Sequence, residues 1–417
     1  MKIKRPNAVI YFMVYIFAYP LLKLFFRLKV ERDIADIPKG AHIVLANHVS
    51  MIDFLMVMLA FYPKRLNAVV AHKFFLIKPL HKVLPFMGCI SKTMFDPDIK
   101  SIIAIKTVLK RGGGILLYPE GRTSISGDYV GIHRAAGKLI KKLGVPVVSC
   151  YLEGAYICVP HWRNLFRRGR VRLTFKTLIT AEEAKALTID NINNRIDARL
   201  SGAEGALPVT KPFRTFSNRR LAEGLQRILY WCPVCNSEYT TETERNEIRC
   251  TACGSNATLD CYARFNNNDN SASQAAGATF PGSIAEWFRG QVRYEAESLN
   301  EDVNPVISQV IVKTPADKPG AGTVISGEGV MSLDPTGWTF KGELFGESIN
   351  LVFPIETIPA ISYDHQNNFQ IYSGGKYYMF LPEDRRKCLK YAILTECVHW
   401  KFSPVKQMTP GDAGFGE

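Results

Sequence analysis

Short apolar segments alternate with helical patterns along residues 40–180, and this alternation limits the folds open to the chain more than any other feature. Such alternation predicts a layered α/β domain with a mixed or parallel sheet. The predicted strands are His42–Ala46, Asn67–Ala71, Gly114–Tyr118, Val145–Leu152 and Val171–Phe175. The helical patterns between them are Phe54–Phe61, Lys100–Arg111 and Gly131–Leu143.

The chain beyond residue 224 is organised differently. A cysteine-rich segment comes first, followed by a polar stretch rich in Asn, Ser, Ala and Gly at 266–282. Short apolar segments separated by turn signals then predict a small antiparallel barrel or sandwich, closed by a helix over Pro382–Trp400. Its succession of strands and a final helix resembles pleckstrin-homology-like barrels in topology. The predicted parts are 1–30 (apolar N-terminal helix), 31–224 (α/β domain), 225–262 (cysteine-rich ribbon), 263–283 (linker), 284–402 (β-rich domain with its closing helix) and 403–417 (tail).

Positive charge is concentrated in the first half of the chain. Residues 1–222 hold 36 Lys and Arg against 14 Asp and Glu, a net charge of +22, whereas residues 223–417 carry −8. Such asymmetry indicates an anionic partner, either nucleic acid or a phospholipid surface. The cysteine-rich segment at 223–262 holds only three arginines against six acidic residues, which argues against nucleic acid.

The N-terminus favours lipid. Ala8–Leu22 is a run of fifteen residues without a charge, and three basic residues precede it. A helix that crosses a bilayer needs about 20 apolar residues. We expect residues 1–30 to lie in or on a membrane, and the alternative is a helix buried in the protein core. The ten cysteines are partly clustered, like metal ligands rather than a disulfide framework, which fits the cytoplasmic face of a membrane.

His48 and Asp53 form a candidate pair for acid–base chemistry. On one continuous helix their side chains would point about 140° apart. They meet only if His48 lies in the turn after the strand His42–Ala46 and Asp53 lies in the first helical turn. Ser50 as N-cap with Asp53 three positions later would fix this geometry as a capping box. The same pattern is typical of a simple helix cap, so the residues alone leave both interpretations open.

A second polar element, Tyr118–Ser124 ("YPEGRTS"), ends the apolar strand that begins at Gly114. A glycine in such a turn lets backbone N–H groups approach an anion, and an arginine supplies a fork of donors that suits phosphate. This element predicts an anion-binding loop, and an ordinary surface loop is the alternative.

Taken in order, His48–Asp53, Tyr118–Ser124 and Gly144–Cys150 ("GVPVVSC") resemble the glycerolipid acyltransferase family, typified by 1-acylglycerol-3-phosphate acyltransferase. The stretch Val70–Ile90, with a basic residue, an apolar helix and a glycine turn, looks like that family as well. The resemblance covers roughly residues 30–180. The family usually reads Glu-Gly-Thr-Arg-Ser where this chain has Glu-Gly-Arg-Thr-Ser, so the arginine comes one position earlier here.

The resemblance implies a role for each matching residue. His48 would be the general base that takes the proton from an acceptor hydroxyl, and Asp53 would hold the imidazole and stabilise its cationic form. Lys92 would stand in for an arginine that usually follows the family's glycine turn. The substrate-binding residues would be Glu120, Gly121, Arg122, Lys92, Val145 and Pro146.

The resemblance also implies the reaction. A fatty acyl chain would pass from a thioester donor, acyl-coenzyme A or acyl carrier protein, to a hydroxyl of a lysophospholipid, with 1-acylglycerol-3-phosphate as the first acceptor to expect. Another lyso-lipid or a glycolipid is the alternative acceptor. No catalytic cofactor and no nucleic acid would be needed. A binding scaffold without catalysis is a further possibility, and the intact His48 and Asp53 argue against it.

Four cysteines carry a separate signal. Cys232 and Cys235 form one Cys-x-x-Cys pair, and Cys250 and Cys253 form a second, with fourteen residues between the two pairs. Two such pairs offer four thiolates to one tetrahedral zinc ion, as in a zinc ribbon. Four protein ligands leave no open position on the metal, so we expect one structural zinc.

Overall fold

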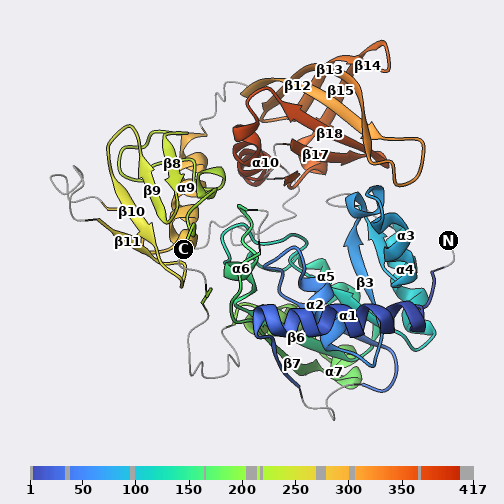
Figure 1. Ribbon diagram of the computed structural model, residues 1–417. Helices are drawn as coiled ribbons and strands as arrows, with labels where there is room; N and C mark the ends of the chain where they lie inside the picture. Colours follow the sequence, from blue (N-terminus) through green and yellow to red (C-terminus); the bar gives the residue numbers. More distant parts are fainter. Residues whose placement is uncertain are drawn as a thin grey trace.

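The computed structural model describes residues 3–32, 38–93, 99–163, 166–202, 214–216, 219–268, 279–299, 306–364 and 368–403. Three sheets follow one another along the chain (Figure 1). The first has seven strands in the order β1-β7-β6-β2-β5-β3-β4, and all neighbours run parallel except β6 and β7. Its strands are β1 Lys29–Glu31, β2 His42–Ala46, β3 Leu66–Ala71, β4 Ile90–Lys92, β5 Gly114–Leu117, β6 Val147–Glu153 and β7 Arg172–Ile179.

Helices cover both faces of this sheet, which confirms the predicted α/β architecture. Along β2, Val44 and Ala46 pack into one core, whereas Ile43 and Leu45 pack into a second core on the opposite face. Because successive side chains of a strand point to opposite faces, a strand buried on both sides has to be apolar throughout. The helices are α2 Asp53–Ala60, α3 Leu80–Phe86, α4 Ile99–Lys110, α5 Ala135–Leu143, α6 Ala155–Cys158, α7 Ala181–Ala186 and α8 Ile189–Leu200, with a 3₁₀ turn η1 at His72–Leu76.

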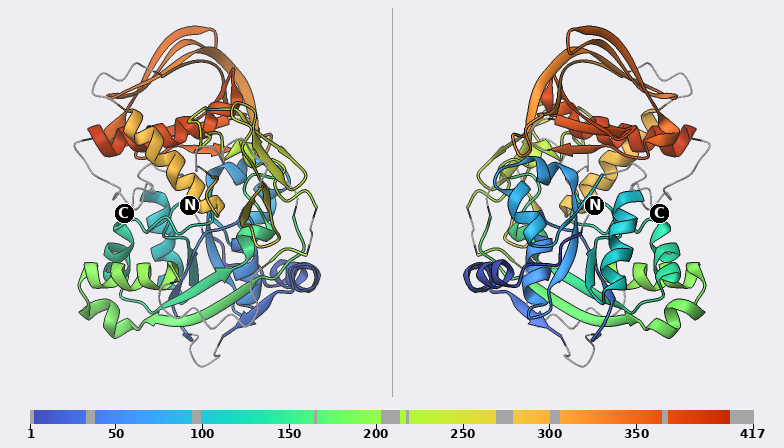
Figure 2. Two further views of the ribbon diagram at one scale, coloured as in Figure 1. Left: turned by 90° about the vertical axis from the view of Figure 1, so that its left-hand side faces the viewer. Right: turned by 90° about the vertical axis from the view of Figure 1, so that its right-hand side faces the viewer.

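The N-terminal helix α1, Ala8–Phe26, lies along the outside of this domain, and Figure 2 shows it end-on at the edge of the molecule. Tyr11 is fully buried, and its hydroxyl donates a hydrogen bond to the Met58 carbonyl of α2 at 2.8 Å. Among the described residues, α1 is the one helix long and apolar enough to cross a membrane. One flank of α1 is packed on α2, and the other exposes Val9, Phe12, Met13, Ile16, Phe17, Leu21 and Leu24.

The cysteine-rich segment forms a small antiparallel sheet with the strand order β11-β10-β9-β8. Trp287 of helix α9, Ile284–Ser298, is fully buried against it and donates from its indole nitrogen to the Trp231 carbonyl at 2.8 Å. The helix therefore packs on the ribbon that precedes it. The strands are β8 Thr241–Glu244, β9 Glu247–Cys250, β10 Asn256–Leu259 and β11 Phe265–Asn267, preceded by the 3₁₀ turn η2 at Leu225–Arg227.

The C-terminal part is β-rich, as expected, with seven antiparallel strands and helix α10, Cys388–Phe402. Trp338 anchors the helix, since its indole nitrogen donates to the Thr395 hydroxyl at 2.9 Å. β12 is absent from the predicted segments, although its buried Val310 and Val312 alternate with exposed Ile311. The strands are β12 Val306–Pro315, β13 Thr323–Asp334, β14 Gly337–Leu344, β15 Glu347–Pro354, β16 Ser362–Asp364, β17 Asn368–Ser373 and β18 Lys376–Pro382, with 3₁₀ turns η4 Ile355–Thr357 and η5 Arg385–Lys387.

Candidate active site and metal centre

His48 and Asp53 meet at the carboxyl end of β2. The chain leaves the strand after Ala46, turns through His48 and enters α2 at Asp53. His48 Nδ1 lies 3.1 Å from Asp53 Oδ2, and the imidazole keeps 21% of its side-chain surface exposed while the carboxylate has none. A buried carboxylate on Nδ1 fixes the orientation of the ring and leaves Nε2 for a second partner.

The Asp53 carboxylate also organises the turn itself. Oδ2 accepts the backbone N–H groups of Val49 and Ser50, each at 2.7 Å, and Oδ1 accepts the Ser50 hydroxyl. The expected capping box is therefore corrected: α2 has Ile52 at its N-cap with no side-chain cap, and the Ser50 hydroxyl donates to the carboxylate. The carboxylate offers more acceptor sites than a serine hydroxyl, so it collects the free N–H groups of this turn.

Neighbouring strands hold the turn from both sides. The Asn47 amide exchanges two hydrogen bonds with the backbone of Leu152 on β6, at 2.7 and 3.0 Å. On the β5 side, the Ser124 N–H donates to the His48 carbonyl at 2.8 Å. Since β2 runs parallel to both β5 and β6, the carboxyl ends of all three strands reach the same edge of the sheet. Sequence reasoning did not single out Asn47, although its place directly after an apolar strand was a signal.

Glu120 links the two polar turns. One carboxylate oxygen accepts the His48 N–H at 2.7 Å and the other accepts the Val130 N–H at 3.3 Å. Burial raises the pKa of Glu120 to about 8, although these two N–H groups and nearby Arg122 act in the opposite direction. Both oxygens of the Glu120 carboxylate are therefore hydrogen-bonded to backbone N–H groups of the protein.

Gly121 and Arg122 follow in the same turn. Gly121 has a φ of +72°, a left-handed conformation that a side chain would strain, and no atom lies within 4 Å of the place of its missing Cβ. Arg122 directs its guanidinium to the carboxylate of Glu396 on α10, 274 residues later. The predicted anion-binding arginine therefore meets an anion of the protein itself.

Thr123 is the site residue that sequence reasoning missed. Its hydroxyl lies 3.0 Å from His48 Nε2, and with Nδ1 donating to Asp53 the hydroxyl is the donor to Nε2. The ring of Tyr118 stacks on the imidazole with centroids 4.3 Å apart. The transposed order Arg122-Thr123 was the available signal, because it brings a hydroxyl to the position of the family's arginine.

The remaining predicted residues lie away from this cluster. Val145 and Pro146 precede β6, and the Pro146 carbonyl accepts the Ile43 N–H at the opening of β2. The structure places them at the opposite edge of the sheet from the dyad, because β6 begins after them and runs toward the dyad over about 15 Å. Lys92 ends β4 beside Ala71, on the same edge as His48 but three strands away, or about 14 Å.

Two comparisons with known proteins bear on the domain that contains this site. Residues 28–153 match the family model described as Acyltransferase. Within these residues the chain is thus similar to the acyltransferase family. A similar solved structure is that of the 1-acyl-sn-glycerophosphate (LPA) acyltransferase PlsC from Thermotoga maritima, at 20% identity and a TM-score of 0.38 over 45% of this chain and 78% of that one. At that identity and score, the likeness supports no conclusion of its own.

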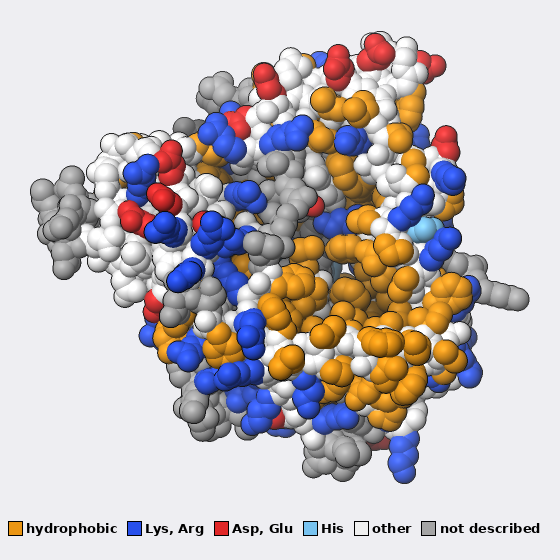
Figure 3. All heavy atoms as spheres, in the orientation of Figure 1, with side chains coloured by type: hydrophobic (Ala, Val, Ile, Leu, Met, Phe, Trp, Pro, Cys, Tyr) orange, Lys and Arg blue, Asp and Glu red, His pale blue; other side chains and the backbone are white. Residues whose placement is uncertain are grey.

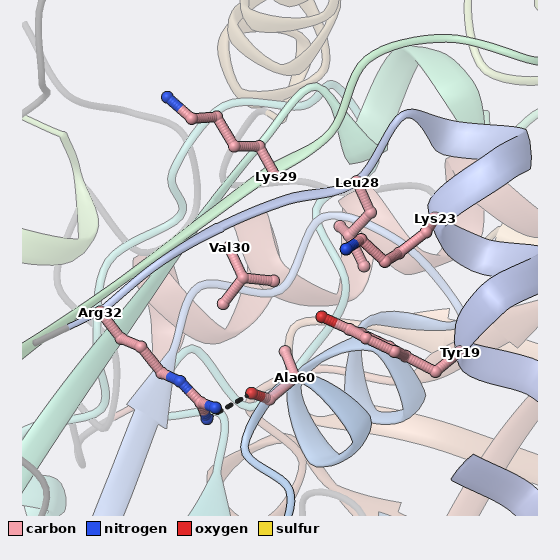
Figure 4. A pocket seen from close by; sticks show the side chains of 7 residues that line it. All are labelled: Tyr19, Lys23, Leu28, Lys29, Val30, Arg32 and Ala60. Carbon is pink, nitrogen blue, oxygen red and sulfur yellow. Dashed lines mark hydrogen bonds between the residues drawn. The ribbon is translucent and has the colours of Figure 1, made fainter. Parts of the chain in front are cut away.

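The pocket in Figure 4 lies elsewhere in the acyltransferase domain. Its volume is about 340 Å³, and Ala60, at the far end of α2 from Asp53, is part of its wall. The Arg32 guanidinium on its rim donates to the Ala60 and Tyr62 carbonyls at 2.7 and 3.2 Å. The length of α2 separates this pocket from the dyad by about 10 Å. The lining residues are Tyr19, Lys23, Leu28, Lys29, Val30, Arg32 and Ala60.

The four predicted cysteine ligands come together outside the acyltransferase domain. All four sulfur atoms lie within 4.8 Å of one another, with Cys232 and Cys253 3.8 Å apart and Cys235 and Cys250 3.7 Å apart. A tetrahedral zinc with Zn–S bonds of about 2.3 Å spaces its sulfur ligands by about 3.8 Å, so the donors fit the ion. Four thiolates would complete its coordination and give it a structural function.

Proposed function

We propose that this chain transfers a fatty acyl group from a thioester donor, acyl-coenzyme A or acyl carrier protein, to a hydroxyl of a lysophospholipid. The observation that carries the proposal is the pairing of His48 Nδ1 with buried Asp53, which leaves Nε2 facing the loop after β5. The acyltransferase-family match over residues 28–153 supports the reaction class.

The geometry suggests how the residues act. The Thr123 hydroxyl, 3.0 Å from His48 Nε2, marks where an acceptor hydroxyl would sit. His48 would take the proton from that hydroxyl as its oxygen attacks the thioester carbon. When the carbon–sulfur bond breaks, the imidazolium would return the proton to the leaving thiolate, so no proton is gained or lost. Asp53 would stabilise the imidazolium in between, and Glu120 would hold the His48 backbone in place.

We assign the acceptor's head group to the side of Arg122. Its guanidinium lies at the same sheet edge as the dyad and would bind the phosphate of 1-acylglycerol-3-phosphate. Gly121 shapes the turn that carries this arginine. A different lyso-lipid or a glycolipid remains the second candidate, and the pairing of Arg122 with Glu396 is the observation that favours it.

Membrane association would follow from α1. Figure 3 shows hydrophobic side chains gathered on the face that carries α1, with lysines and arginines around their margin. Because α1 packs against α2 through buried Tyr11, we propose that it lies in the interface and does not span the bilayer. All ten cysteines are free, which supports the cytoplasmic face.

The test is a transfer assay with full-length protein on mixed vesicles, read by lipid mass spectrometry. Both thioester donors are offered with lysophosphatidic acid, other lysophospholipids and a glycolipid acceptor. We expect acylation of at least one lysophospholipid, and none with His48→Ala. Activity that persists at the wild-type rate in His48→Ala, or no transfer to any acceptor, overturns the proposal.

A further inference from the structure

The ion pair between Arg122 and Glu396 joins the acceptor side of the proposed site to the C-terminal domain. The two side chains keep only 18% and 11% of their surface exposed. Water and salt therefore screen this pair much less than a surface ion pair. Separating the two groups without a replacement would leave a charge poorly solvated, so each needs a partner of opposite sign.

The surroundings hold α10 in this position. Lys390 of α10 contacts Glu238 of the ribbon at 2.6 Å and buried Glu295 of α9 at 3.2 Å. One continuous hydrophobic core runs from Trp162 of the acyltransferase domain through the ribbon to Trp338 of the C-terminal sheet. Figure 2 shows α9 and α10 between that sheet and the acyltransferase domain. Glu396 is thus presented by a helix that is packed on several elements.

The loop that carries Arg122 is held at a second point. Asp128, six residues further on, forms an ion pair with Arg289 of α9. Both side chains of that pair are substantially exposed, so its contribution to stability is small. Together with the Arg122–Glu396 pair, it connects the loop of residues 121–128 to both α9 and α10.

Tyr363 has a buried hydroxyl whose pKa is affected by both charges of the ion pair. The hydroxyl of Tyr363, on β16, is buried and makes no hydrogen bond in the part of the chain that the structure describes. Its electrostatic surroundings include both Arg122 and Glu396. A buried hydroxyl without a partner is costly, so an acceptor that came within its reach would be favoured.

We propose that Glu396 is a specificity-determining residue for the acceptor: it occupies the guanidinium of Arg122, and an acceptor phosphate binds there only by displacing it. This inference rests on the proposed acyl transfer. A carboxylate and a phosphate use the same fork of donors, so the two anions compete. The C-terminal domain thereby weakens the binding of acceptors that are held mainly by their phosphate. An acceptor whose acyl chain contributes further affinity can still displace Glu396.

The experiment removes the competing charge and keeps the shape. Glu396→Gln retains the side-chain volume and a carbonyl that still accepts from Arg122. In the full-length chain carrying His48→Ala, glycerol 3-phosphate is titrated by calorimetry, with glycerol as the uncharged probe. We expect glycerol 3-phosphate to bind at least about fivefold more tightly than in the parent, at the low end of typical coupling between two sites. Glycerol binding should not change.

Three comparisons make the result specific. Glu297→Gln removes an equal charge from the exposed face of α9 and should leave the affinity unchanged. Adding Arg122→Gln should abolish the gain from Glu396→Gln. Glu396→Asp, which keeps the charge on a shorter side chain, serves as the second variant, and melting temperatures check that each variant is folded. We expect Glu396→Asp to bind no less tightly than the parent, because the shorter acid holds Arg122 less well.

The kinetic arm separates this inference from the proposed function. With His48 intact, Glu396→Gln should lower KM for lysophosphatidic acid by a similar factor while kcat changes little. An unchanged or weaker glycerol 3-phosphate affinity in Glu396→Gln, or an equal gain in Glu297→Gln, overturns the inference even if wild-type transfer is robust. If the wild type transfers to no acceptor, the proposed function fails, and the calorimetric result still decides whether Glu396 competes with phosphate.

Discussion

The hydroxyl of Thr123 lies 3.0 Å from Nε2 of His48, on the side of the imidazole opposite its contact with Asp53. Two mechanisms are compatible with this row of a Thr123 hydroxyl, a His48 imidazole and an Asp53 carboxylate. The hydroxyl is itself a nucleophile that is acylated first, or it marks the position that an acceptor hydroxyl takes over. The second mechanism needs no covalent intermediate, and it makes the Thr123 side chain dispensable for the chemical step.

Thr123→Val distinguishes these mechanisms because it removes the hydroxyl and keeps the branched shape. We expect kcat to fall by less than about tenfold, whereas loss of a true acid–base or nucleophilic group costs about 10² or more. Steady-state kinetics and intact-protein mass spectrometry after mixing with donor alone give the answer. A trapped acyl adduct on the wild type that Thr123→Val cannot form would establish the covalent route.

His48→Ala should reduce the rate of transfer by at least about 10²-fold, since it removes the group that accepts the acceptor's proton. Asp53→Asn should also be impaired, because the amide cannot accept from the imidazole, Val49 and Ser50 together. The matched control is His133→Ala, which removes an exposed histidine in the loop after β5. Equal losses in His48→Ala and His133→Ala would show that the assay reports folding and not chemistry.

Local pattern predicted much of this site. Apolar runs placed β2 and β5 within a residue of their observed bounds, and parallel strands bring the ends of both runs to one edge of the sheet. His48, Asp53, Glu120 and Arg122 follow these two runs, and it was the family resemblance that assigned all four to one site. Val145 and Pro146 lie at the other edge of the sheet because they precede β6, and the direction of a strand decides which edge its flanking residues reach.

The contacts that these residues make with distant parts of the chain could not be predicted from the local sequence pattern. Glu396 lies on a helix 274 residues from Arg122, and nothing in the sequence around either one specifies the other. Thr123 belongs to the motif Tyr118–Ser124, but the sequence did not predict its contact with His48. A shift of one residue along a turn changes which side chain points at the imidazole. Contacts of this kind depend on how separate parts of the chain pack, and periodicity carries no information about that.

Glu120 gives the protein a specific pH dependence. Its folded-state pKa, raised by burial to about 8, exceeds the ordinary value of 4.5, so the folded protein binds the extra proton between these limits. Stability should therefore fall as pH rises through this window. Melting temperatures between about pH 5 and about pH 8.5 should decline more for the wild type than for Glu120→Gln, which cannot ionise. Parallel profiles would mean that the carboxyl stays ionised throughout.

The four-cysteine cluster should hold one zinc per chain. Cys232→Ser should abolish stoichiometric zinc and lower the melting temperature, because the metal stabilises a small sheet with little core of its own. Cys261→Ser is the matched control, since Cys261 lies in the same segment outside the cluster and should leave the zinc content at one. Elemental analysis and calorimetry measure both effects. A chelator that halts transfer at once while the melting temperature holds would instead place zinc in the reaction.

The outer flank of α1 should control membrane binding. Phe17 and Leu21 are exposed there, and burying each in the interface is worth about 1.5–3 kcal/mol, or about tenfold or more in the partition coefficient. Phe17→Asp and Leu21→Asp should each weaken sedimentation with vesicles containing phosphatidylglycerol by that factor. The control is Phe345→Asp, which changes an equally exposed aromatic residue between β14 and β15. The residual binding should fall with salt, because the basic N-terminal half still attracts anionic lipid. If both α1 variants sediment like the wild type while Phe345→Asp does not, the C-terminal sheet and not α1 faces the membrane.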